Sequence, residues 1–471
     1  MNGGRFDLVV LGDVVTPHGV LRGGGLGVRG SQVAAVWATP PAGFEASDVV
    51  DATARWVLPG AIDAHVHSFS APEEGFTAAT RAAAAGGVTT IIEMPYDAGA
   101  PVNAAPVLER KIERLEREAV VDVALLGTIR KQGGLDEIDR LAAGGVCGFK
   151  VSLFETDPER FPRIEDGELA KAFALIRDVG LTVGVHAEDG EIIYPLIAEY
   201  TASQRLYPRA HCETRPPISE TASVALALEL AAAADVRFHI YHASLPRSFD
   251  LVQRYRQQGL RVTAETCPHY LLLSEDDMDR LGPLAKINPP LRSPAAVSDL
   301  RRLLANGTVD MVTSDHAPWS RSQKSNPNIF ANASGTPGVE TLLPLVYSTG
   351  VASGDLTIER LAAVLAEGPA RAFSLYPRKG GLAVGADADI AILDPSAHWA
   401  IDGAQMESTA GWTPYDGLTV QGKVIRTIVR GQTVYDGMSV TGQPGGGTFI
   451  RPVAVAAATP VLASGSVSAN G

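Results

Sequence analysis

The chain has 471 residues, enough for one large domain or two smaller ones, and its composition of 45% hydrophobic and 20% charged residues is that of a folded protein. Acidic residues outnumber basic ones by 53 to 40, and the net charge of −13 argues against nucleic acid or an anionic membrane as the main partner. The three cysteines form no CxxC pair and fit a reducing compartment, so we expect a cytoplasmic protein.

The N-terminal region, residues 1–55, is rich in short strand patterns and glycine turns. It lacks the basic start and long apolar core of a signal peptide. Across the chain, apolar runs stay shorter than the ~18 residues of a membrane span, so we expect no membrane partner. The region is not a convincing domain by itself.

The middle region, residues 56–375, alternates between apolar, β-branched stretches and helical patterns. Strand-like stretches begin near residues 56, 88, 121, 146, 181, 237, 261 and 309, and helical patterns between them include 106–119, 166–180, 219–234 and 294–307. Eight strands with helical crossovers are typical of a (β/α)₈ TIM barrel. An open, doubly wound sheet is the structural alternative.

The C-terminal part returns to the texture of the N-terminus. Residues 376–441 include the strand patterns LAVGADADIAILDP and TVQGKVIRTIVRGQTVYDG. We expect them to pair with residues 1–55 as one small β-sandwich beside the barrel, giving an α/β fold of two parts. Residues 442–471 are rich in glycine, alanine and serine and predict an extended or flexible tail.

Potential metal ligands stand at or near the ends of five predicted strands. The period of two along a strand points both imidazoles of His65-Val66-His67 the same way, as one metal ion requires. The others are Lys150, His186, His242 and Asp315. Barrel enzymes build their sites at these carboxyl ends, and this clustering favours the barrel over the open sheet.

Lys150 is unusual because it stands inside an apolar strand pattern, GFKVSL. An unpaired ammonium is costly to bury. Either the side chain extends to solvent at the strand end, or Lys150 is not an ammonium in the folded protein.

Motifs and their order resemble one known family. They include PGAIDAHVH from residue 59, GGVTTIIEMP, HAED, YHAS, ETCPHY, INPPLR, SDHAP and PGVETLLPL. Over roughly residues 6–440 the chain resembles the amidohydrolase superfamily, in the branch of hydantoinases, dihydropyrimidinases, allantoinases and dihydroorotases. The resemblance implies hydrolytic opening of a cyclic amide (EC 3.5.2.-) by a homotetramer or homodimer.

The resemblance also implies two divalent metal ions, normally Zn²⁺, joined by a carboxylated Lys150. His65, His67 and Asp315 would hold one ion, and His186 and His242 the other. A neutral amine between cations can react with CO₂, and the carbamate offers one oxygen to each ion. Asp315 would be the general base for attack by a bridging hydroxide. Asn288, the backbone at Gly338, His269 and Glu155 are the expected substrate contacts.

The substrate is less well defined by sequence. Dihydroorotases place an arginine just after the HxH pair, but this chain reads HVHSFSAPEEGF, which disfavours dihydroorotate; Arg292 is the sequence's candidate for an alternative cation. Glu155 replaces the tyrosine that hydantoinases carry five residues past the lysine. The run EGFTAATRAAAAGGVTT resembles allantoinases. We expect a hydantoin-type cyclic ureide or imide first, and allantoin as the alternative.

Two other classes of function are disfavoured by the ligand set. A non-catalytic scaffold relative would have lost metal ligands, whereas this chain keeps all six residues. A mononuclear nucleobase deaminase of the same superfamily would lack Lys150.

Overall fold

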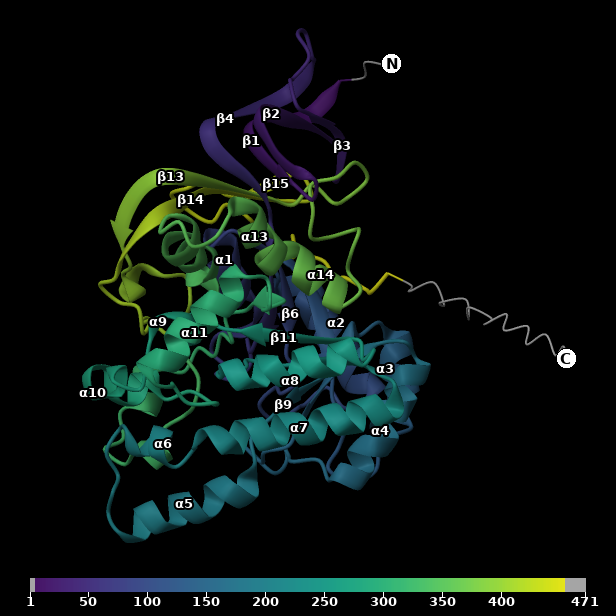
Figure 1. Cartoon of the computed structure of the whole chain (residues 1–471). Coiled ribbons are helices and arrows are strands. Elements are labelled where there is room, and N and C mark those ends of the chain that lie inside the picture. Colours follow the sequence, from purple (N-terminus) through teal and green to yellow (C-terminus); the bar gives the residue numbers. More distant parts are fainter. Residues whose placement is uncertain (1–4, 454–471) are drawn as a thin grey trace, which may run out of the picture.

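The structure, a computed structural model, describes residues 5–453 of the chain. Within that range the strands form two sheets, one of eight parallel strands and one of seven mixed strands. Figure 1 shows the mixed sheet lying beside the helix-covered barrel. This confirms the two-part α/β fold predicted from the sequence.

The barrel strands are the eight stretches expected from the sequence, and their spatial order follows the chain. After the last strand, the His67 N–H donates to the His316 carbonyl at 2.8 Å and the His316 N–H donates to the His65 carbonyl at 3.3 Å, which closes the ring. The strands are β5 (Ala61–Val66), β6 (Val88–Glu93), β7 (Asp122–Gly127), β8 (Gly148–Ser152), β9 (Thr182–His186), β10 (Arg237–Ile240), β11 (Val262–Thr266) and β12 (Met311–Val312).

Helices follow most of the barrel strands and cover the outside of the barrel (Figure 1). They are α1 (Gly75–Ala85), α2 (Ala105–Glu118), α3 (Glu137–Gly144), α4 (Asp166–Asp178), α5 (Gly190–Ala202), α6 (Ala210–Glu213), α7 (Pro217–Ala234), α8 (Pro246–Gln257), α9 (Pro268–Leu272), α10 (Asp277–Leu281), α11 (Pro294–Ala305), α12 (Leu342–Val346), α13 (Ile358–Ala362) and α14 (Gly368–Ala372). By length and hydropathy α7 could cross a membrane, but it packs between α4 and α8 on the barrel.

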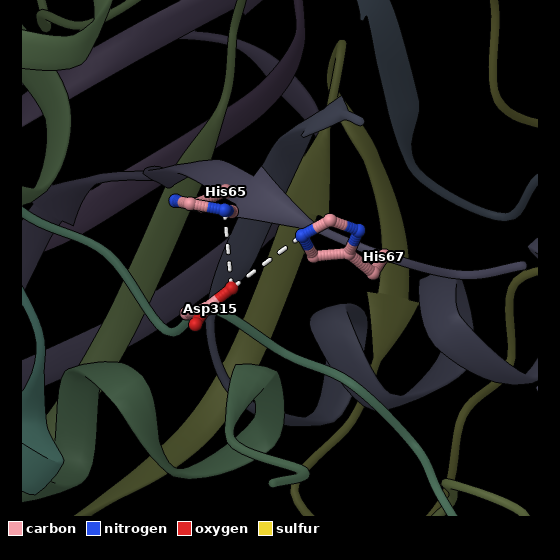
Figure 2. Close-up of side chains that lie close together, drawn as sticks. All are labelled: His65, His67 and Asp315. Carbon is pink, nitrogen blue, oxygen red and sulfur yellow. Dashed lines mark ion pairs between the residues drawn. The ribbon is translucent and has the colours of Figure 1, made fainter. Parts of the chain in front are cut away.

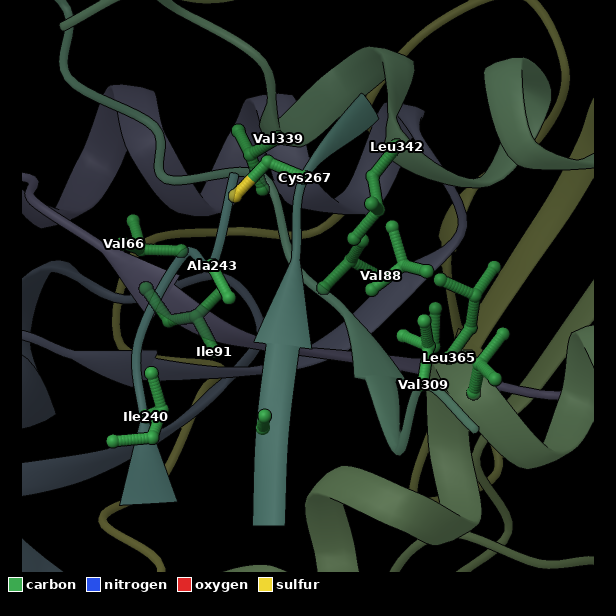
Figure 3. Close-up of a cluster of buried hydrophobic side chains, with 14 of the residues drawn as sticks. Val66, Val88, Ile91, Ile240, Ala243, Cys267, Val309, Val339, Leu342 and Leu365 are labelled. Atoms are coloured by element: carbon green, nitrogen blue, oxygen red, sulfur yellow. The ribbon is translucent and has the colours of Figure 1, made fainter. Parts of the chain in front are cut away.

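The barrel strands are buried on both faces, as in other parallel sheets covered by helices. Figure 3 shows side chains from several strands and from α12 meeting in one buried cluster. Val88, Ile91 and Val309 are fully buried there, with Leu342 and Leu365 from the helical side. This packing holds the strand ends, and therefore the polar residues on them, in fixed positions.

The N-terminal and C-terminal strands form one continuous mixed sheet. The sequence predicts that these strands pair, as a small β-sandwich. The spatial order of the sheet is β15-β14-β13-β4-β1-β2-β3. Strand β4 joins the N-terminal and C-terminal parts of this sheet, because it pairs parallel with β1 and antiparallel with β13. The strands are β1 (Phe6–Thr16), β2 (Gly19–Arg29), β3 (Gln32–Trp37), β4 (Ala46–Pro59), β13 (Ile390–Ala400), β14 (Thr419–Val429) and β15 (Gln432–Tyr435).

Gly60 links β4 directly to β5 and so connects the small sheet to the strand that carries His65 and His67. A Cβ atom at Gly60 would lie 2.2 Å from Thr89 side-chain atoms, so only glycine fits without a shift of its neighbours. The Gly60 N–H donates to the Asp389 carbonyl at 2.9 Å.

A buried ionic cluster lies between the barrel and the small sheet. Lys379 is 2% exposed, and its Nζ atom lies 2.6 Å from Asp122 and from Asp389, and 3.0 Å from Asp387. Arg430 adds a contact of 3.1 Å to Asp122. Asp122 begins β7 and Asp389 precedes β13, so the cluster joins the two parts of the fold.

The segment after β15 packs against the barrel as far as it is described. The Ile450 N–H donates to the Val123 carbonyl at 2.9 Å, and Ile450 is fully buried. The remainder of the predicted tail, residues 454–471, lies outside the described residues.

Candidate metal centre and substrate cavity

His65 and His67 project from the carboxyl end of β5 toward Asp315, which follows β12 (Figure 2). The Asp315 Oδ1 atom lies 3.0 Å from His65 Nε2 and 3.5 Å from His67 Nε2. One ligand atom from each of the three residues lies within 4.8 Å of the other two. Strand β5 therefore delivers both imidazoles to one point, as the HxH spacing predicts.

Lys150 stands on β8 with its amine inside this group. The side chain is 0% exposed, which excludes a lysine that extends to solvent, and its Nζ atom lies 2.6 Å from His65 Nε2. Burial lowers the pKa of Lys150 to about 8, against the opposing effect of Asp315. A lowered pKa increases the fraction of neutral amine, the form that reacts with CO₂.

His186 and His242, at the ends of β9 and β10, form the other half of the group. His186 Nδ1 lies 2.9 Å from His242 Nε2, and the His65 and His242 rings are 5.2 Å apart. His242 and Asp315 have φ of 37° and 49°, in the left-handed region that non-glycine residues avoid. Such strain, of order 1–3 kcal/mol per residue, is typical of functional sites held by the surrounding fold.

Two buried glutamates set the orientation of the imidazoles. Glu265 on β11 accepts from His65 Nδ1 at 2.5 Å and contacts His239 Nε2 at 3.2 Å, so the His65 proton is on Nδ1 and its Nε2 lone pair faces Asp315. Glu188 accepts from His186 Nε2 at 3.0 Å and pairs with Arg215 at 3.4 Å. His186 Nδ1 is thereby left to face His242.

Neither glutamate was expected from the sequence as a site residue, although both belong to motifs given above. Glu188 is two residues after His186 in HAED, and Glu265 begins ETCPHY. A carboxylate two residues after a ligand is the signal that could have found Glu188. Glu265 reaches His65 from β11, which does not neighbour β5 in the sheet, so no local spacing indicates it.

The group fits divalent metal ions by its donor chemistry. Burial lowers the pKa of all four imidazoles, which keeps them neutral and able to coordinate. Imidazole nitrogens combined with a carboxylate suit zinc and similar divalent ions. His67 and His242 each also have a buried Nδ1 atom without a hydrogen-bond partner among the described residues. By contrast, the aspartates around Lys379 already enclose a cation.

A cavity of about 450 Å³ opens onto the metal-ligand group. Its wall includes the ligands His67, Lys150, His242 and Asp315. The rest of the wall is a mixture of aromatic, basic and small residues: Ser70, Phe154, Glu155, Thr156, Asp157, Arg160, Phe161, Arg215, Lys286, Asn288, Ala317, Trp319, Phe330, Asn332, Ala333, Ser334 and Gly335. The volume is that of a small-molecule site.

Two of the four expected substrate contacts line this cavity. The Asn288 Oδ1 atom is buried without a hydrogen-bond partner among the described residues, so it is available to an N–H of a ligand. Glu155 is at the mouth, where it pairs with Lys131.

The other two expected contacts are not among the described residues that line the cavity. The Gly338 N–H donates to His316 Nδ1 at 3.1 Å, and the loop instead presents Ser334 and Gly335 to the cavity. His269 is buried, and it too is missing from the described cavity lining.

Arg292, which the sequence suggests as a cation for a substrate carboxylate, is not among the described residues that line the cavity. Arg292 is buried against Glu220 at 3.1 Å and also donates to Ser244, so its charge is used within the core. The cation near β5 is Arg160, whose Nη2 donates to Ser70 Oγ at 2.8 Å from the loop after β8. Its position could not be predicted because the loop conformation brings together residues 90 positions apart.

The sequence is similar to known proteins along nearly its whole length. The profile of the Amidohydrolase family matches residues 56–434. An allantoinase of Rubrobacter xylanophilus is 37% identical, covering 95% of this chain and 98% of the relative. An L-hydantoinase of Paenarthrobacter aurescens is 34% identical, covering 90% and 93%. The solved L-hydantoinase (dihydropyrimidinase) of Arthrobacter aurescens superimposes with a TM-score of 0.92 at 33% identity, covering 95% and 100%.

Proposed function

The chain belongs to the amidohydrolase family, in its cyclic amidohydrolase branch, and on this basis we propose that it hydrolyses the ring amide of allantoin. It is a hydrolase of carbon–nitrogen bonds in cyclic amides. The observation that carries the proposal is the group of Lys150, Asp315 and four imidazoles beside a cavity. The cavity wall includes Asn288, whose Oδ1 atom has no hydrogen-bond partner among the described residues.

The choice of allantoin reverses the order expected from the sequence, in which a hydantoin-type ring came first. The 37% identical relative from Rubrobacter and a 35% identical relative from Deinococcus radiodurans are both allantoinases. A hydantoin remains the second candidate, because the L-hydantoinase structure superimposes over 95% of the chain. The aromatic side chains Phe154 and Phe161 in the cavity wall would also suit an apolar hydantoin substituent.

We propose that His65, His67 and Asp315 hold one divalent ion, that His186 and His242 hold a second, and that carboxylated Lys150 joins them. Zinc fits this set of nitrogen and oxygen donors. Such ions, when bound, make a water molecule acidic enough to ionise near neutral pH and polarise a carbonyl group. The buried Lys150 amine supports the proposal, because it lies 2.6 Å from a ligand nitrogen and the side chain is 0% exposed.

The side chains of this chain supply positioning and proton transfer. Asp315 faces the cavity and is placed to accept a proton from the attacking water and return it to the leaving ring nitrogen. The side-chain Oδ1 atom of Asn288 accepts a hydrogen bond from a ring N–H and orients the scissile amide. Glu265 and Glu188 keep the imidazoles in the tautomers that face the reaction centre.

We further propose a homodimer or homotetramer. The outer face of α7 exposes Ile218 (55%) and Leu226 (38%), which supports burial against another copy. Light scattering coupled to size exclusion tests this directly, and a monomer at micromolar concentration would contradict it.

The experiment for the proposed function is a substrate panel. Protein supplied with zinc, manganese or cobalt is assayed for ring opening of allantoin, hydantoin, 5-benzylhydantoin, dihydrouracil, dihydroorotate and succinimide. Allantoin should give the highest kcat/KM. A higher value for a hydantoin would transfer the assignment to the second candidate, and no ring opening with any metal would contradict hydrolysis of cyclic amides by this chain.

A further inference from the structure

Arg160 is a cavity-lining cation that keeps unused hydrogen-bond donors. Of the two other basic groups on the wall away from the metal ligands, Arg215 pairs with Glu188 at 3.4 Å. Lys286 donates to the carbonyls of Phe330 and Asn332. Within residues 5–453, Arg160 has no carboxylate within ion-pair distance.

The donors of Arg160 are only partly satisfied by the protein. Its Nε–H donates to the Tyr96 carbonyl at 2.5 Å and its Nη2 to Ser70 Oγ at 2.8 Å. A guanidinium carries five N–H donors in a planar fork, so the Nη1 side is left for a ligand. The group is half-buried, where a hydrogen bond from a cation is stronger than in water.

The loop that carries Arg160 is held by hydrogen bonds within itself and by a ring contact with Tyr96. Asp157 Oδ1 accepts from the N–H groups of Glu159 and Arg160, at 3.0 and 2.8 Å. The next residue, Phe161, stacks on Tyr96 with 3.7 Å between ring centroids. The guanidinium is therefore fixed in advance, which reduces the entropy lost when it binds a ligand.

We propose that Arg160 is a specificity-determining residue, which binds a carbonyl or carboxylate oxygen on the exocyclic substituent of the ring. The inference rests on the proposed function, because it assumes that a cyclic amide is bound with its scissile bond near Asp315. A ureido substituent carries such an exocyclic carbonyl oxygen. An unsubstituted hydantoin has only the carbonyl oxygens of its ring, and an alkyl or benzyl substituent adds none. Arg160 thus favours ureido- and carboxylate-bearing rings over apolar ones.

The test compares one variant on two substrates that share the same ring. Arg160→Met keeps much of the side-chain volume and removes the charge and the donors. The expected result is a decrease of about 10- to 100-fold in kcat/KM for allantoin, the range for a lost hydrogen bond from a charged group. For unsubstituted hydantoin the decrease should stay below about 3-fold, because no substituent contact is lost.

Arg163→Met is the matched control. Arg163 is on the same loop, pairs with Asp166 at 3.5 Å and is not among the described residues that line the active-site cavity. This variant should retain wild-type values for both rings. Arg160→Lys should recover part of the allantoin rate, because it restores a cation without the fork.

The possible outcomes separate this inference from the proposed function. Equal losses for allantoin and hydantoin in Arg160→Met would mean that Arg160 only holds the loop, and would overturn the inference. Unchanged kcat/KM for allantoin in Arg160→Met would overturn it as well. Failure of the wild-type protein to open any ring would instead contradict the proposed function.

Discussion

Replacing Lys379 by methionine is expected to lower the free energy of unfolding by about 3–5 kcal/mol, the usual range when one partner of a buried ionic group is removed. The Lys379 Nζ atom lies within 3.0 Å of Asp122, Asp387 and Asp389, all of which are buried. Arg430 and Arg378 contact this group from its edge, at 3.1 and 3.0 Å, so three carboxylates would remain with two cations.

The destabilisation should depend on pH. Burial lowers the pKa of Lys379, but the three aspartates outweigh that effect and raise it above the ordinary lysine value, so the wild-type contribution is fully present at neutral pH. In the variant the crowded aspartates bind protons more readily in the folded than in the unfolded state. The loss of unfolding free energy caused by Lys379→Met should therefore be smaller at pH 5 than at pH 8.

The measurement is urea-induced unfolding followed by tryptophan fluorescence at both pH values. Lys423→Met is the control, because Lys423 is exposed on β14 of the same sheet and should change the stability by less than ~0.5 kcal/mol. Adding Asp389→Asn to Lys379→Met should recover part of the loss, since it removes one uncompensated charge. A loss below ~1 kcal/mol for Lys379→Met, or one that does not change with pH, would refute the reasoning.

Three further predictions concern single contacts. Glu265→Gln should weaken zinc binding about 10- to 100-fold in a chelator competition, because His65 Nδ1 loses the carboxylate that orients the ring; unchanged affinity would contradict this role. Gly60→Ala should lower the stability by about 1–3 kcal/mol in urea unfolding, and Thr89→Ala should relieve part of that loss because the clash is with Thr89; equal stability would show that the backbone adjusts freely. Burial lowers the pKa of Lys286 to about 7 against 10.5 when unfolded, so the folded state binds fewer protons between these values and the Lys286 contribution to stability should rise with pH. The stability difference between wild type and Lys286→Met should shift in favour of wild type from pH 7 to pH 9.5, and a constant difference would contradict the lowered pKa.

The alternation of apolar, strand-like stretches with helical patterns predicts the barrel well, because the barrel strands are buried and helices follow most of them. The strand-end pattern also locates His65, His67 and Asp315, since parallel strands deliver their carboxyl ends to one rim. Sequence predicts less about Arg160, whose loop position depends on turns and on stacking with Tyr96. The roles of Glu265 and Arg292 depend on the neighbouring strands and helices that each contacts, and local patterns do not encode those contacts.

We propose that the buried Lys150 amine adds CO₂, loses a proton and would then, as a carbamate, help to hold two metal ions. Elemental analysis of zinc-reconstituted protein tests it most directly. Wild type should carry about two ions per chain, and Lys150→Ala should lose most of its metal, because two cations would then face each other without a shared anion. Added acetate or propionate should restore part of the metal to Lys150→Ala by filling the vacated space. Wild-type protein with well under one ion per chain, or Lys150→Ala with its full metal content, would contradict the claim.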